Sequence, residues 1–360
     1  MILVSCQKQK AEWKGTIEEV DGVTIVKNPK EPIYGEDIFN LEEELTIGEK
    51  ENGKEPVFIG IRSIRVDDEE NIHVLDARAF QVKVFNKDGT HLRNIGKRGQ
   101  GPGEIQLAMN MELVSGKEIM VYDLGNRRLS FFSLDGMLLN EVSTGKIPRL
   151  FRVIPNSKGE LIGWIVLNLA EERVQELKIF NPSLEPISNV TVLKRKQSPR
   201  NVINILRPVF SYQVLKNNKI IWGIGSKYEI NISDSNGKLE KTIIKDFDPI
   251  KITEVDKEYE IKTYFGDREI PSDYKIEFDE YYPAFHHLNY DDEGRIFART
   301  NERKDEGEYY YDVFDSEGRY IAKIPLRIMP RVWKKNKLYT IEEDEDGLQM
   351  VKRYNVSWEY

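Results

Sequence analysis

Asn71-Ile72-His73-Val74-Leu75-Asp76 and Glu118-Ile119-Met120-Val121-Tyr122-Asp123 are two copies of one pattern, offset by 47 residues. At the same offset, residues 81–89 (QVKVFNKDG) match residues 128–136 (RLSFFSLDG). Each copy predicts two strands with alternating apolar residues, a turn that contains Asp-Gly, and a third strand such as residues 90–95. A fixed repeat of this length indicates one supersecondary unit used several times.

Weaker copies of the same unit fill the rest of the chain. They lie at 159–180, 219–237, 291–318 and 337–354. Six units of four short strands each predict an all-β fold, a six-bladed β-propeller. The expected blades cover residues 57–103, 104–147, 148–200, 201–248, 280–326 and 327–360.

The last unit lacks its outer strand because the chain ends soon after its third strand. Residues 41–48 resemble the outer strands of the other units, such as residues 92–96. We therefore expect residues 41–48 to pair with the last blade and close the ring, which removes an exposed sheet edge. An earlier strand, residues 22–26, is expected along the outside or over one face.

Residues 246–283 interrupt the repeat and predict a short helical insert. Thr253, followed by Asp256 three residues later, is typical of a helix N-cap, and Gly266 of a helix end. A rough helical stripe lies between them, made of Val255, Tyr259, Lys262 and Phe265. The chain as a whole is expected to hold a signal and tether (1–14) and a single propeller domain (15–360).

The charge balance argues against one broad class of partner. The 53 Lys and Arg residues and 61 Asp and Glu residues leave a net charge of −8. This sign is wrong for a general nucleic-acid binder, so we expect no nucleic acid partner. The apolar runs are far shorter than the roughly 20 residues that span a bilayer. A single cysteine also excludes an intrachain disulfide.

That cysteine, Cys6, follows Leu3-Val4-Ser5. An aliphatic residue, a small residue and then Cys resembles the lipobox of bacterial lipoproteins, in which the thiol receives a diacylglycerol. The resemblance implies that Cys6 anchors the protein to a membrane of the cell envelope. The signal ahead of it is short, so we expect the precursor to start further upstream. The alternative is an apolar N-terminus without a role.

Residues 123–129 (DLGNRRL) and the glycine-rich residues 95–104 (IGKRGQGPGE) resemble the NHL repeat. The first unit departs from that motif at Ala77-Arg78-Ala79. Together with Cys6 and residues 41–48, the whole chain resembles bacterial six-bladed propeller lipoproteins of NHL type. The resemblance implies the fold; it implies little about function, because propellers host many unrelated activities.

A propeller offers a funnel on its axis, lined by the first strand of each blade and the loops that enter it. Arginine, histidine and aromatic residues at these positions suit an anionic or carbohydrate ligand. The alternative is that they only complete the channel wall. The candidate ligand-binding residues are Arg62, Asn110, Arg152, Phe210, His286, His287 and Arg331, with Asp123, Asn126 and Arg127 from a loop on the same face.

These features favour a binding or scaffold module at the cell envelope. Its expected partner is a small anionic, carbohydrate or peptide ligand, or a protein, and the chain is expected to be a monomer. His286 and His287 are adjacent and should point to opposite sides of a strand, so we predict no metal site. The sequence has no Gly-x-Ser-x-Gly motif and its only cysteine is assigned to the tether, so we predict no catalytic residue, and we expect no cofactor. The alternative is an envelope lyase or hydrolase that acts on a glycan or peptide.

Overall fold

The structure is a computed structural model, and it describes residues 12–49, 57–147, 149–199, 201–266, 268–305 and 307–360. The expected lipidation site Cys6 and most of the expected tether lie outside the described residues. Within the described residues, no helix combines the length and the apolar character that crossing a membrane would require.

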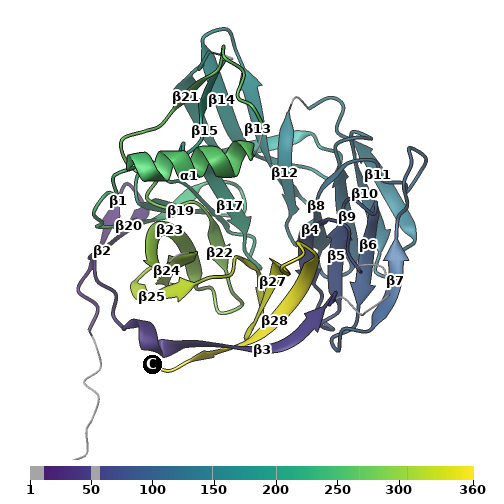
Figure 1. Cartoon of the computed structure of the whole chain (residues 1–360), viewed down its shortest axis with the longest axis horizontal. Coiled ribbons are helices and arrows are strands. Elements are labelled where there is room, and N and C mark those ends of the chain that lie inside the picture. The colour runs from purple at the N-terminus through teal and green to yellow at the C-terminus, as the bar shows by residue number, and fades with distance from the viewer. Residues whose placement is uncertain (1–11, 50–56, 148, 200, 267, 306) are drawn as a thin grey trace, which may run out of the picture.

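Six four-stranded units form the body of the molecule (Figure 1). Blade 1 contains β4 (Ile61–Val66), β5 (Ile72–Asp76), β6 (Gln81–Phe85) and β7 (His91–Ile95). Blade 2 contains β8 (Ala108–Val114), β9 (Glu118–Asp123), β10 (Arg128–Ser133) and β11 (Leu138–Ser143). Blade 3 contains β12 (Leu150–Pro155), β13 (Leu161–Asn168), β14 (Glu172–Phe180) and β15 (Pro186–Lys196).

The second half of the ring repeats this order. Blade 4 contains β17 (Phe210–Val214), β18 (Ile220–Ile224), β19 (Glu229–Ser233) and β20 (Leu239–Lys245). Blade 5 contains β22 (Leu288–Tyr290), β23 (Ile296–Asp305), β24 (Glu308–Phe314) and β25 (Tyr320–Leu326). Blade 6 contains β26 (Pro330–Lys334), β27 (Lys337–Glu343), β28 (Gln349–Trp358) and the N-terminal strand β3 (Phe39–Ile47).

The ring is closed twice, at its centre and at its seam. The inner strands β4, β8, β12, β17, β22 and β26 contact one another in a complete cycle. At the seam, β3 pairs antiparallel with β28, from Ile47 opposite Val351 to Phe39 opposite Trp358. The predicted six-bladed propeller with an N-terminal closing strand is confirmed.

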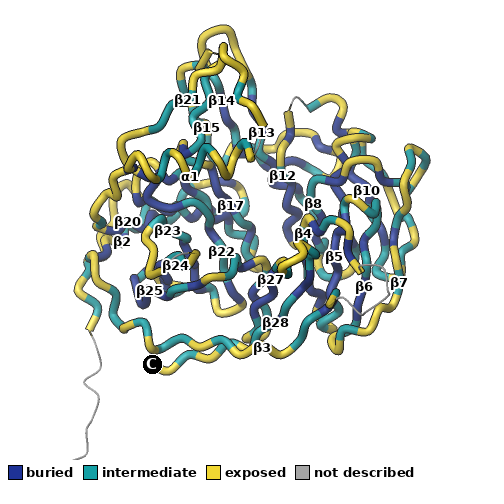
Figure 2. The backbone as a smooth tube through the Cα atoms, in the orientation of Figure 1, coloured by how far each residue is buried: buried dark blue, intermediate teal, exposed yellow. Residues whose placement is uncertain are grey.

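The core lies between neighbouring blades. Each sheet packs against its neighbours on both faces, so a second strand such as β5 is buried along its whole length and each interface has its own apolar cluster (Figure 2). Between blades 5 and 6, for example, Phe297 stacks on Trp333 with ring centroids 4.3 Å apart. The predicted Asp-Gly turns are present as well, since Gly89 and Gly136 have φ values of 82° and 98°.

An N-terminal hairpin extends blade 4. β1 (Thr16–Val20) pairs with β2 (Val23–Asn28), and β2 runs parallel to the outer strand β20, so the early strand lies along the outside of the ring. The Trp13 indole donates a hydrogen bond to Asn28 Oδ1 at 2.9 Å. Contacts with the fold therefore begin inside the segment that was expected to be a tether.

The insert contains one helix, α1 (Glu254–Phe265), as predicted. Thr253 caps its first turn by accepting a hydrogen bond from Asp256 N, and the Asp256 carboxylate accepts one from Thr253 N. The expected apolar stripe is not buried, and Val255 is 75% exposed. The helix lies over the ring (Figure 1), where the Tyr259 side chain contacts the Arg303 guanidinium of blade 5. Beside the helix, β16 (Val202–Asn204) and β21 (Lys275–Glu277) form a separate parallel pair.

Ring closure predicts the effect of one substitution at the seam. Ile47, only 6% exposed, packs against Phe58, Tyr339 and Val351. Ile47→Ala should lower the free energy of unfolding by about 2–4 kcal/mol, because it leaves a cavity between blades 6 and 1. Ile17→Ala, in the half-exposed outer strand β1, is the matched control and should change it by less than about 1 kcal/mol. Equal effects in urea unfolding would contradict the role of β3 as the closing strand.

Candidate functional site

A cavity of about 750 Å³ lies on the axis of the ring. Residues from all six inner strands line it, so it is the channel that the fold creates rather than a groove on one blade. Its volume is in the range of small-molecule sites. The residues at the start of the inner strands line one end of the cavity, and the turns that follow these strands line the other end.

β-bulges shape the first of these ends, called the mouth here. Ile61 and Ser63 of β4 pair with consecutive residues of β5, so Arg62 is an extra residue without a cross-strand partner. Met109 in β8 and Arg331 in β26 are extra residues in the same way, and β12 shifts register between Leu150 and Val153. A bulge redirects the side chain that it carries. The mouth is therefore lined by side chains that regular pairing would have directed elsewhere.

Most of the charges along the cavity are paired. Lys334 binds Asp68 at 2.9 Å and Lys216 binds Asp292 at 2.8 Å, both where the inner strands leave the ring. The remaining acid, Glu112, is buried and accepts two hydrogen bonds from the Arg65 guanidinium, one of them of 2.5 Å from Nε.

Three arginines remain without an acid of their own: Arg62, Arg152 and Arg331. Arg152 lies 3.8 Å from the Glu112 carboxylate that Arg65 already holds, and Arg62 donates to the carbonyl oxygen and the sulfur of Met109. Among the described residues, Arg331 has neither a hydrogen bond nor an ion pair. Arg331 is exposed to the channel, and partial desolvation together with repulsion from Arg65 lowers its pKa. The mouth therefore has an excess of positive charge.

His287 lines the same cavity and is neutral at pH 7. Burial lowers its pKa to about 4, and repulsion from His286, Arg299, Arg331 and Arg152 contributes. A neutral imidazole offers one donor and one acceptor beside the arginines.

A ring of side-chain hydrogen bonds joins the inner strands. In each blade one side chain of the inner strand donates to a backbone carbonyl of the next blade. The six bonds are Arg62 Nε to Met109 O (3.3 Å), Asn110 Nδ2 to Val153 O (3.1 Å), Arg152 Nη1 to Tyr212 O (3.3 Å), Gln213 Nε2 to Leu288 O (2.8 Å), Asn289 Nδ2 to Pro330 O (3.4 Å) and Lys334 Nζ to Val66 O (2.8 Å). Arg62, Asn110 and Arg152 thus help to build the wall.

Five of the ten candidate residues line the cavity, namely Arg62, Asn110, Arg152, His287 and Arg331. Phe210 and His286 do not. Phe210 is buried against Tyr212 and Trp222, and His286 Nε2 hydrogen-bonds Asn301 Oδ1 at 2.8 Å. Both histidines precede β22 and their ring centroids lie 6.3 Å apart, so the predicted opposite orientation across a strand is not confirmed.

The three candidates from the blade 2 loop also lie outside the cavity, and two of them hold backbone together. The buried carboxylate of Asp123 accepts from the backbone N–H groups of Gln106 and Leu107 at 2.8 Å. Asn126 Nδ2 donates to the carbonyls of Gly99 and Glu104, which fixes the glycine-rich connection between blades 1 and 2. Arg127 is exposed and donates to Gly145 O.

The cavity also contains residues that the sequence reasoning missed. Arg65 and Glu112 are the central ion pair, yet neither was among the candidates. A signal was present: the two residues are 47 positions apart, the offset of the repeat, so equivalent positions in blades 1 and 2 carry opposite charges. Within the part of the chain that the structure describes, no three His, Cys, Asp or Glu residues come together to hold a metal ion.

The ring of six sheets and its lined axial channel define a six-bladed β-propeller. The chain belongs to the DUF5128 family, described as a 6-bladed beta-propeller, whose model matches residues 53–346. No curated protein matches the sequence.

Solved structures with low sequence identity share the fold. An exported-protein candidate from Bacteroides fragilis has 12% identity and a TM-score of 0.57, with 93% of this chain and 100% of that chain covered. A DUF4221 family member from Bacteroides vulgatus has 11% identity and a TM-score of 0.54, with coverage of 90% and 100%. At this identity the likeness shows the fold alone.

The environment of His287 predicts its titration. Its imidazole should titrate near pH 4, so between that value and about 6.5 the unfolded chain binds more protons and the stability of the fold decreases as the pH is lowered. NMR of the imidazole nitrogens, assigned with His287→Gln, measures the pKa directly. The His287→Gln protein should also show a shallower loss of stability over this range. A pKa near 6.5 would mean that the ring is exposed to bulk water.

Proposed function

We propose that the axial cavity binds a small anionic ligand. The observation that carries this proposal is Arg331: its guanidinium faces the cavity without a hydrogen bond or an acid among the described residues. Arg331 is exposed to the channel, so its positive charge is accessible to an anion that enters the cavity. A carboxylate or another planar anion would supply the missing partner and accept two parallel hydrogen bonds.

The other residues of the mouth indicate the chemistry of the ligand. Arg62 and Arg152 extend the positive field, and His287 adds a neutral donor or acceptor. Phe151, 43% exposed, offers an aromatic surface at the mouth and packs on Trp164. A sugar acid combines an anionic group with a ring face and polar hydroxyls. We therefore favour an acidic carbohydrate over a neutral one.

The alternative, a lyase or hydrolase, has less support. The acids that line the cavity, Asp68, Glu112 and Asp292, all have basic partners. His287 would be the base, but a pKa of about 4 makes it a weak one at neutral pH. Binding without chemistry requires neither a free carboxylate nor a strong base.

We also propose that the protein is a lipoprotein of the cell envelope, anchored through Cys6, and that its blades are of NHL type. The support is the sequence Leu3-Val4-Ser5-Cys6 and the NHL-like residues 123–129. An anchored propeller would present its channel to solutes outside the cytoplasm, where acidic glycans occur.

Arg331 provides the test of ligand binding. Arg331→Gln should weaken binding of glucuronate or galacturonate at least about tenfold, because a charge-assisted hydrogen bond contributes roughly 1.5–3 kcal/mol. Isothermal titration calorimetry measures the affinity, with neutral glucose as the ligand control. Arg98→Gln, an exposed arginine outside the cavity, is the matched variant and should bind as the parent does. Equal affinities in both variants would move the site away from the mouth.

The anchor has its own test. In the native host, the chain should incorporate radiolabelled palmitate and sediment with membranes. Cys6→Ser should abolish both, since the thiol is the acceptor, whereas Ser235→Ala, at the blade 4 turn, should leave both intact. Sedimentation of the Cys6→Ser protein with membranes would contradict the lipid anchor.

A further inference from the structure

Blade 3 carries a projection that the other blades lack. Its strands β14 and β15 have 9 and 11 residues, compared with 5 each for β6 and β7 of blade 1. Their far ends stand out from the ring together with the β16–β21 pair (Figure 1). The projection is defined here as residues 167–174, 193–199 and 201–207 with β21. It is separate from the axial cavity, because none of these residues lines that cavity.

Arginines gather at the base of the projection. Arg173 of β14 lies directly opposite Arg195 of β15, a register that places both side chains on one face of the sheet. Arg149 and Arg207 lie close enough to act on Arg173. Burial lowers the pKa of Arg173, and repulsion from Arg207, Arg149 and Arg195 lowers it further. Burial and Arg207 lower the pKa of Arg195 in the same way.

No direct ion pair neutralises these four arginines within the described chain. None of the four arginines forms an ion pair or a side-chain hydrogen bond with another described residue. The acid that acts on Arg195 is Asp279, and its carboxylate accepts a hydrogen bond from Asn204 Nδ2 at 3.0 Å. The Nε atom of Arg173 is buried and has no hydrogen-bond partner. A buried donor without a partner is costly unless a ligand supplies the acceptor.

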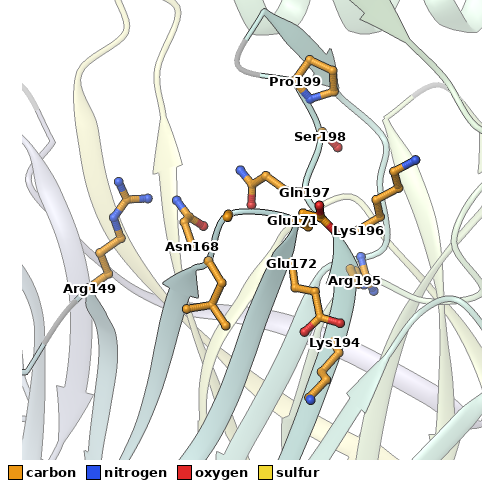
Figure 3. A pocket seen from close by; sticks show the side chains of 12 residues that line it. Arg149, Asn168, Glu171, Glu172, Lys194, Arg195, Lys196, Gln197, Ser198 and Pro199 are labelled. Atoms are coloured by element: carbon orange, nitrogen blue, oxygen red, sulfur yellow. The ribbon is translucent and has the colours of Figure 1, made fainter.

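Two arginines of the cluster, Arg149 and Arg195, line a cavity of about 1570 Å³, and Arg173 lies opposite Arg195 in the sheet beside it. In the view of Figure 3, the amides of Asn168 and Gln197 lie between Arg149 on one side and Arg195 on the other. The Gln197 Oε1 atom is buried and also lacks a hydrogen-bond partner. Four basic residues (Arg149, Lys194, Arg195, Lys196) and two acidic residues (Glu171, Glu172) line this cavity.

The backbone at Arg149 is unusual as well. Its φ of 44° lies in the left-handed region, which a residue with a side chain adopts at a cost. This conformation occurs at the start of blade 3, immediately before β12. Arg149 thus comes from a different segment than Arg173, Arg195 and Arg207, and the four arginines come from four separate segments of the chain.

We infer that the arginines of the projection bind a phosphate group, either of a free polyphosphate or of a lipid headgroup. Phosphate carries about two negative charges and several acceptor oxygens at neutral pH, which matches several guanidinium groups that lack acceptors. A single carboxylate would leave more of the repulsion in place. The inference is independent of the ligand proposed for the axial cavity.

The test uses the full chain and two probes. Pyrophosphate binding is measured by calorimetry, and binding to phosphatidylglycerol vesicles by cosedimentation, with phosphatidylcholine vesicles as the reference. The double variant Arg173→Gln/Arg195→Gln should weaken binding at least about tenfold. In the absence of phosphate it should melt at a higher temperature than the parent, because like charges no longer oppose each other. A role of these arginines in the fold alone would lower the melting temperature instead.

Controls separate the possible outcomes. Arg98→Gln should behave as the parent does. Arg207→Gln, a single change at an exposed position, replaces the double variant if that variant fails to fold. Binding of pyrophosphate identifies a soluble ligand, and binding of vesicles alone identifies a lipid headgroup; both support the inference. It is overturned if neither probe binds, or if Arg331→Gln abolishes pyrophosphate binding while the double variant retains it.

Discussion

The cycle of hydrogen bonds around the axis is the constraint on which the structure depends. Each inner strand pairs on one edge only, with the second strand of its own blade, so its other edge presents unpaired backbone carbonyls to the channel. In every blade a side chain of the preceding inner strand donates to one of these carbonyls, from Arg62 around to Lys334. The cycle satisfies one carbonyl on the free edge of each inner strand and links every blade to the next around the channel.

Two of the three arginines at the mouth belong to this cycle of hydrogen bonds, and the third does not. Arg62 and Arg152 each donate to a carbonyl of the next blade, so part of their effect on any ligand is to hold the wall in place. Arg331 is the extra residue of a bulge, and among the described residues its side chain donates no hydrogen bond to a neighbouring blade. Of the three arginines, Arg331 is therefore the one whose proposed role in anion binding is separate from the hydrogen bonds of the channel wall.

The sequence was sufficient for the fold but only partly for the site. The 47-residue offset and the resemblance of residues 41–48 to an outer strand identify blades and closure, because both depend on local alternation. The directions of the side chains at the mouth depend on bulges at Arg62 and Arg331. A bulge shifts the strand register, and the alternation of apolar and polar residues in the sequence does not reveal it. Asp123 was placed by its position in the repeat, yet it satisfies backbone amides. Position in a repeat predicts location better than role.

Unneutralised charge occurs at both proposed sites, and the two surroundings tolerate it for different reasons. At the mouth, Arg331 is exposed to the channel, so water weakens its repulsion from Arg65. In the projection, Arg173 and Arg195 face each other across the longest strand pair of blade 3, where many backbone bonds offset a modest like-charge cost. A rigid sheet can hold charged side chains in position before a ligand binds to them. Packing alone would favour a neutral side chain at either position, and the anions proposed above would neutralise the charge at both.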